Sequence, residues 1–129
     1  MDITSKYIAM CVTASEIQEP WEPKMGDFIW DSAGLVYPLS SNNVKYYYKD
    51  KERISKFLRW LPRQDQLQDM IDIRDESECI DLWKLHSFDY FAMENWTELR
   101  TYEQLWLGFV MQDLYGKVWR DKWVSINTQ

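Results

Sequence analysis

The chain has 129 residues, 46% of them hydrophobic and 28% charged, with a formal net charge of −6 and a pI of about 4.7. This length and composition are typical of one globular domain with its own core, and they exclude a disordered chain. The acidic balance makes nucleic acid and anionic lipid unlikely partners, and no apolar run reaches the roughly 20 residues of a membrane span.

The first 61 residues predict a helix followed by a small sheet. Apolar residues recur at three- and four-residue spacing over residues 2–17, which predicts an amphipathic helix. Pro20 and Pro23 end this helix because proline cannot continue it. From about residue 26 to 61, runs of strand-forming residues alternate with turn residues, which predicts an antiparallel sheet. Its expected strands cover residues 27–30, 35–37, 44–48 and 54–61.

Two further helices are expected before residue 100. Residues 62–71 and 76–86 each carry a helical stripe of apolar side chains. Residues 87–95 are rich in aromatic side chains and predict neither a helix nor a strand clearly.

The last part of the chain has the best-marked signals. Thr101 and Gln104 have the spacing of a capping box, which predicts a helix start, and Gly116 is suited to a left-handed helix end. Residues 117–119 and 123–125 predict a terminal hairpin. The expected fold class is therefore α+β, with the sheet packed by an N-terminal helix and two to three C-terminal helices in a single domain over residues 1–129.

The two cysteines, Cys11 and Cys79, lie far apart in the sequence. The first residues lack the basic start and apolar core of a signal peptide. We therefore expect a cytoplasmic protein with two reduced thiols.

Residues that carry catalysis or bind cofactors are scarce. His86 is the only histidine, and it lies among aromatic residues, so a structural role is favoured over a general base. One histidine and two distant cysteines are too few for a zinc site, and no phosphate-binding glycine loop is present. We predict no catalytic, cofactor-binding or metal-binding residue, and a non-enzymatic protein is favoured.

Two alternatives remain open at this point. Asp65, Asp69 and Asp72 have the spacing of one helix face, so they could hold Mg²⁺ or Mn²⁺ in a metal-dependent hydrolase or nuclease. A solvated acidic face, or one that attracts a basic partner, is the simpler interpretation. The second alternative is single-stranded nucleic-acid binding through a mixture of cations and rings. Its residues are Lys45, Tyr47, Lys49 and Trp60.

Aromatic residues suggest a different kind of surface. Eight tryptophans, eight tyrosines and five phenylalanines make up 16% of the chain. Each buried indole needs a partner for its N–H, so we expect one or two tryptophans to stay partly exposed, as at many interaction surfaces. The candidate surface combines four aromatic residues with two acidic ones: Trp106, Phe109, Trp119, Trp123, Asp69 and Asp72.

Three stretches of the chain carry a family resemblance: residues 16–27 (EIQEPWEPKMGD), residues 60–71 (WLPRQDQLQDMI) and residues 102–119. Together they resemble a group of small uncharacterised proteins encoded by phages and prophages of Gram-positive bacteria. The resemblance implies no catalytic residue. The missing catalytic constellations, the aromatic load and the acidic surface predict a non-enzymatic phage or prophage accessory protein that acts by protein–protein interaction with a host or phage protein.

Overall fold

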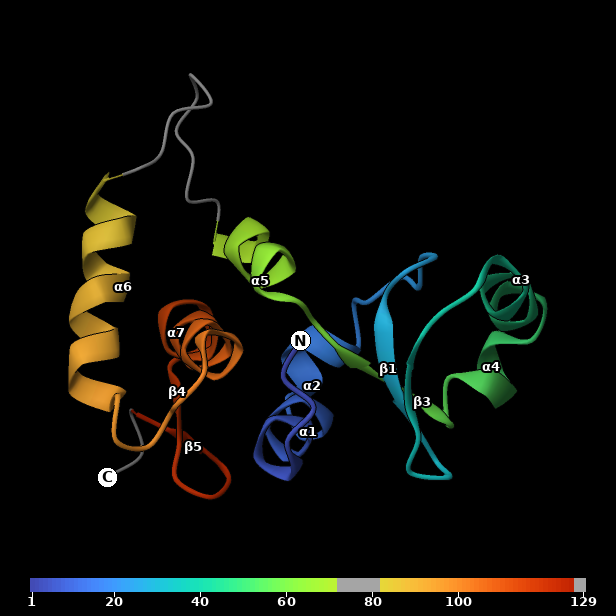
Figure 1. Cartoon of the computed structure of the whole chain (residues 1–129), viewed down its shortest axis with the longest axis horizontal. Coiled ribbons are helices and arrows are strands. Elements are labelled where there is room, and N and C mark those ends of the chain that lie inside the picture. The colour runs from blue at the N-terminus through green and yellow to red at the C-terminus, as the bar shows by residue number, and fades with distance from the viewer. Residues whose placement is uncertain (72–81, 127–129) are drawn as a thin grey trace. The chain divides into compact units, whose positions relative to one another are not determined.

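The computed structural model describes residues 1–71 and 82–126 (Figure 1). The chain forms two compact units. The first consists of Ile3–Arg63, and the second of Met1–Asp2 together with Gln64–Gln129. The single domain expected from the sequence stays a prediction.

The first unit is built on a three-stranded antiparallel sheet of order β2-β1-β3. Its central strand β1 pairs Ile29 with Tyr37 on one side and with Trp60 on the other. Figure 1 shows α1 and α2 on one side of this sheet and α3 and α4 on the other. The elements are α1 (Ser5–Val12), α2 (Ser15–Gln18), β1 (Phe28–Asp31), β2 (Val36–Pro38), α3 (Ser41–Lys49), α4 (Lys51–Ile54) and β3 (Leu58–Leu61).

Local chemistry explains where α1 begins and how it packs. The Thr4 hydroxyl accepts a hydrogen bond from the Tyr7 backbone N–H, which caps the first turn. Tyr7, Met10 and Cys11 are fully buried at three- and four-residue spacing, as an amphipathic helix requires. The predicted helix over residues 2–17 is confirmed in outline, although the structure divides it into α1 and α2.

The predicted strand over residues 44–48 is wrong, because this segment belongs to α3. Ser40 and Asn43 form a capping box, in which each side chain accepts a hydrogen bond from the backbone N–H of the other. The three consecutive tyrosines favour a strand by intrinsic preference, but a helix start two turns upstream fixes their conformation instead.

In its described residues, the second unit has three helices and a two-stranded hairpin. The elements are α5 (Gln64–Ile71), α6 (Leu82–Asn95), α7 (Tyr102–Tyr115), β4 (Lys117–Trp119) and β5 (Trp123–Ser125). The predicted ends of α7 are confirmed: the Thr101 hydroxyl accepts from the Gln104 N–H, and Gly116 has a φ of +63°. The terminal hairpin also lies where the sequence predicts it. The ambiguous residues 87–95 continue α6.

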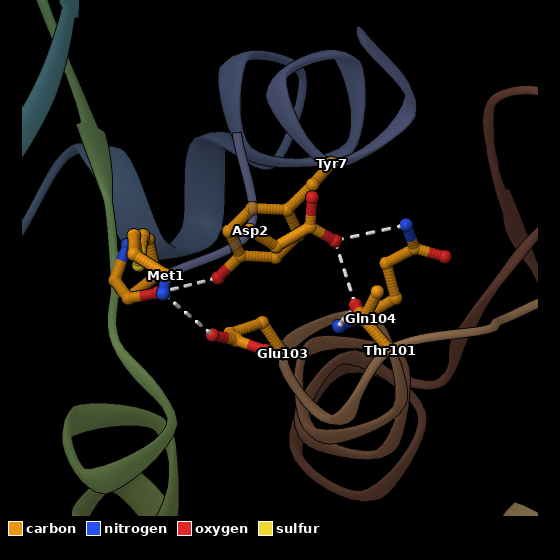
Figure 2. Close-up of polar contacts among 7 residues, drawn as sticks. Met1, Asp2, Tyr7, Thr101, Glu103 and Gln104 are labelled. Carbon is orange, nitrogen blue, oxygen red and sulfur yellow. Dashed lines mark hydrogen bonds and ion pairs between the residues drawn. The ribbon is translucent and has the colours of Figure 1, made fainter. Parts of the chain in front are cut away.

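A buried carboxylate supports the start of α7. Figure 2 shows the Asp2 side chain between Thr101 and Gln104. Its Oδ2 atom accepts hydrogen bonds from the Thr101 hydroxyl at 2.6 Å and from the Gln104 amide at 2.9 Å. Asp2 is 7% exposed, and a negative group is favourable at the positive end of a helix dipole.

These elements confirm the α+β fold class. Across the described part of the chain, no helix is both long enough and apolar enough to cross a membrane. Cys11 is buried, whereas Cys79 lies outside the described residues, so the expected reduced state of the two thiols stays a prediction.

Candidate functional site

Two residues of the predicted interaction surface lie in the core. Trp106 is 2% exposed and Phe109 is 5% exposed. The reason is the packing of α6 on α7: the Phe88 ring stacks on Trp106 with a centroid distance of 3.7 Å, and Phe91 contacts Phe109 at 5.6 Å. The prediction that Trp106 and Phe109 form a surface is therefore wrong, and both rings stabilise the second unit instead.

The other two tryptophans of that surface form a pair on the terminal hairpin. Trp119 and Trp123 are opposite each other across β4 and β5, with ring centroids 5.1 Å apart in a T-shaped arrangement. Both are half-buried. The Trp119 indole N–H is buried and has no hydrogen-bond partner within the described part of the chain.

The acidic residues are only partly described. Asp65 and Asp69 are exposed on α5, whereas Asp72 lies outside the described residues. Over residues 1–71 and 82–126, no three His, Cys, Asp or Glu side chains are grouped so that they could hold a metal ion. The metal-dependent alternative, which relies on Asp72, is therefore not tested.

An exposed apolar face of the second unit lies on α6. Leu82 is 75% exposed, Trp83 81%, Tyr90 61% and Met93 81%. The opposite face of the same helix is buried through Phe88 and Phe91. Apolar residues on both faces of a helix indicate two contact surfaces. This pattern between residues 82 and 93 is the sequence signal that could have identified the face.

The exposed residues of α6 have a regular order. Leu82, His86, Asp89 and Met93 are spaced by four, three and four residues, so they form one stripe along the helix. All four are exposed. Trp83 and Tyr90 flank this stripe on one side, each one residue after a member of it. We call these six residues the α6 face.

A groove of about 350 Å³ borders the α6 face, between α6 and α7. Its lining includes His86 and Tyr90 from the face itself, together with Glu94, Asp113 and the edge of Phe109. The pKa of Tyr90 is raised, first by a hydrogen bond with the Glu94 side chain and then by the negative charge of that carboxylate. The groove therefore places polar groups beside the exposed apolar side chains of the α6 face, which is the usual arrangement of a protein interface.

The residues of the nucleic-acid alternative lie in the first unit. Lys45, Tyr47 and Lys49 are on α3, and Trp60 is on β3. Trp60 is 8% exposed, and its ring stacks on Trp21 with a centroid distance of 5.8 Å and an interplanar angle of 3°. The Trp60 side chain is therefore buried and packs against the Trp21 ring.

Comparison with family models, curated proteins and solved structures gave no match to this chain.

Proposed function

We propose that this chain is a non-enzymatic accessory protein of a phage or prophage, and that it acts by protein–protein interaction through the α6 face. The observation that carries the proposal is the exposure of Leu82, Trp83, Tyr90 and Met93 on one helix. Exposed apolar patches with a polar rim mark interaction sites, and tryptophan and tyrosine are enriched where binding energy concentrates.

The order of residues on the α6 face favours a second copy of the chain as one partner. An antiparallel copy of α6, with a two-fold axis between Ser87 and Phe88, sets Leu82 opposite the partner's Met93. The same axis sets His86 opposite the partner's Asp89. Each pair occurs twice, which is the self-complementarity that a two-fold interface requires.

The flanking residues fit the same arrangement. In an antiparallel pair of helices with this register, Trp83 lies beside the partner's Tyr90, so two aromatic contacts would border the stripe. A helix of 14 residues is about 21 Å long. We expect this single helix–helix contact to bury less area than a standard interface of about 800 Å² per partner. We therefore expect weak association, with a dissociation constant in the micromolar range.

Sedimentation equilibrium tests the proposed dimer. The unchanged protein should associate in the micromolar range, and Trp83→Ala with Met93→Asp should be monomeric. The variant His86→Glu places like charges opposite each other twice, so it should weaken the dimer by about fivefold. Adding Asp89→Lys to His86→Glu places opposite charges across the axis and should restore association. Failure of this rescue would contradict the register. A monomer at all concentrations would contradict the dimer itself.

A pull-down separates the general function from the dimer. Tagged protein is used to capture partners from lysate of a Gram-positive host that carries the prophage. The matched control is the variant Trp83→Ala with Met93→Asp, whose changes lie on the exposed side of α6, so that its thermal unfolding should match the parent. A stoichiometric partner that the parent captures and this variant does not capture supports interaction through the α6 face. Equal capture by both proteins would refute that role for the face.

A further inference from the structure

Charge is unevenly divided between the two units. Residues 3–63 contain nine Lys or Arg and seven Asp or Glu, a net charge of +2, whereas the other unit has six against fourteen, a net charge of −8. Most of the positive charge lies in residues 41–60, with six Lys or Arg and two acidic residues. The overall net charge of −6 therefore conceals a basic segment that can attract an anionic ligand locally.

The structure places this basic segment on two short helices together with exposed rings. Lys45 and Lys49 are exposed on α3, and Tyr46 beside them is 65% exposed. The Lys51 ammonium lies 5.0 Å from the centre of the Tyr48 ring, and Phe57 is exposed after α4. Cations and exposed rings therefore both lie in this segment, whereas Tyr47, two residues from Lys45 and from Lys49, lies on the other side of α3.

A pocket of about 370 Å³ lies between α3 and the start of β3. Glu19, Trp21, Tyr47 and Arg59 are among the residues that line it. Its rings are held in place: Trp21 stacks on Trp60, and its indole N–H donates to the Asp27 carboxylate at 3.0 Å. The Tyr47 ring lies 6.3 Å from that of Trp21. A planar ligand can stack on such rings without ordering them first.

A second hollow of about 340 Å³ lies along α3. Its lining consists of Asn42, Lys45, Tyr46 and Lys49, which have the spacing of one helix face. It offers two ammonium groups and a ring, and no carboxylate. Phosphate groups suit this hollow, whereas the Glu19 carboxylate that lines the first pocket repels them.

We propose that this part of the first unit binds single-stranded nucleic acid that crosses α3, with a base stacked in the pocket of Trp21 and Tyr47 on one side of the helix and the phosphates of nucleotides farther along the strand on Lys45 and Lys49 on the other. Single strands are favoured over duplexes because a paired base is already stacked inside its helix and cannot enter a side-chain pocket. Glu19 can accept a hydrogen bond from an N–H group of a base, such as the N3–H of thymine, so its carboxylate suits the base and not the backbone. This site is independent of the α6 face.

Fluorescence anisotropy with a labelled oligothymidylate of about 12 nucleotides tests the proposal. Affinity should fall with salt, and Lys45→Ala with Lys49→Ala should reduce the slope of log affinity against log salt by about 1.4, as expected for two lost phosphate contacts on a single strand. Tyr47→Ala should weaken binding by about tenfold, whereas Tyr47→Phe, which keeps the ring, should bind like the parent.

The matched control is Arg120→Ala with Lys122→Ala, which removes two exposed cations from the β4–β5 hairpin of the other unit. It changes the net charge equally but should leave the salt slope unchanged. Circular dichroism melting shows that each variant is folded. Absence of binding at low salt, equal effects of the two double variants, or tighter binding to a duplex of the same length would each overturn the proposal.

Discussion

Asp2 shows how one buried carboxylate can stabilise a helix start. Its Oδ2 accepts from both Thr101 and Gln104 (Figure 2). We predict that Asp2→Ala lowers the free energy of unfolding by about 2 kcal/mol, because two donors lose their acceptor in a buried position. Urea denaturation monitored by circular dichroism measures this change.

The control for this residue is Asp2→Asn, which keeps one acceptor oxygen and removes the charge. It should cost about 1 kcal/mol, less than the alanine variant. Equal losses for the two variants would show that the charge matters and the hydrogen bonds do not.

Helix α7 is the element whose limits are best encoded locally. Gly116 has a φ of +63°, and its N–H donates to the carbonyls of Met111 and Gln112. We predict that Gly116→Ala lowers the free energy of unfolding by about 1 kcal/mol, because a side chain disfavours the left-handed conformation. Thermal and urea unfolding check the value. Gln112→Ala, at an exposed position of the same helix, should be nearly neutral, and an equal loss there would contradict the explanation.

Elements with a local signal were therefore predictable, and those decided by tertiary contacts were not. The caps of α7 and the hairpin of Trp119 and Trp123 follow from short spacings. In α3, the strand preference of three tyrosines led to the wrong prediction, because the capping box of Ser40 and Asn43 starts a helix there. The Phe88 ring of α6 stacks on Trp106, and no spacing within α7 reveals that contact.

At the scale of the molecule, the net charge and the aromatic count of the whole chain did not reveal the candidate sites. The net charge of −6 argues against an anionic ligand, yet it combines a unit of +2 with a unit of −8. The aromatic count predicts exposed rings, but it does not say which rings. In the structure Trp83 is exposed and Trp106 is buried. Trp83 lies on the exposed face of α6, whereas Phe88 on the opposite face stacks on Trp106.

Stability at alkaline pH provides a test of the first unit in the intact protein. The pKa of Tyr37 is raised by burial and then by the charge of Asp31, and the pKa of Tyr47 is raised by burial and then by Tyr48 and Glu22. Above the ordinary value of 10.0, the folded protein keeps protons that the unfolded chain has lost. The free energy of unfolding should therefore fall as the pH rises through this range.

Urea denaturation at about pH 9 and about pH 11 measures this loss. Lysines also titrate there, so the informative comparison is with the variant Tyr37→Phe with Tyr47→Phe, which keeps the rings and removes the two phenols. The double variant should lose less stability between the two pH values than the parent. An identical loss would show that groups other than these tyrosines control the alkaline transition, and it would remove the evidence that burial of Tyr47 beside Trp21 raises its pKa.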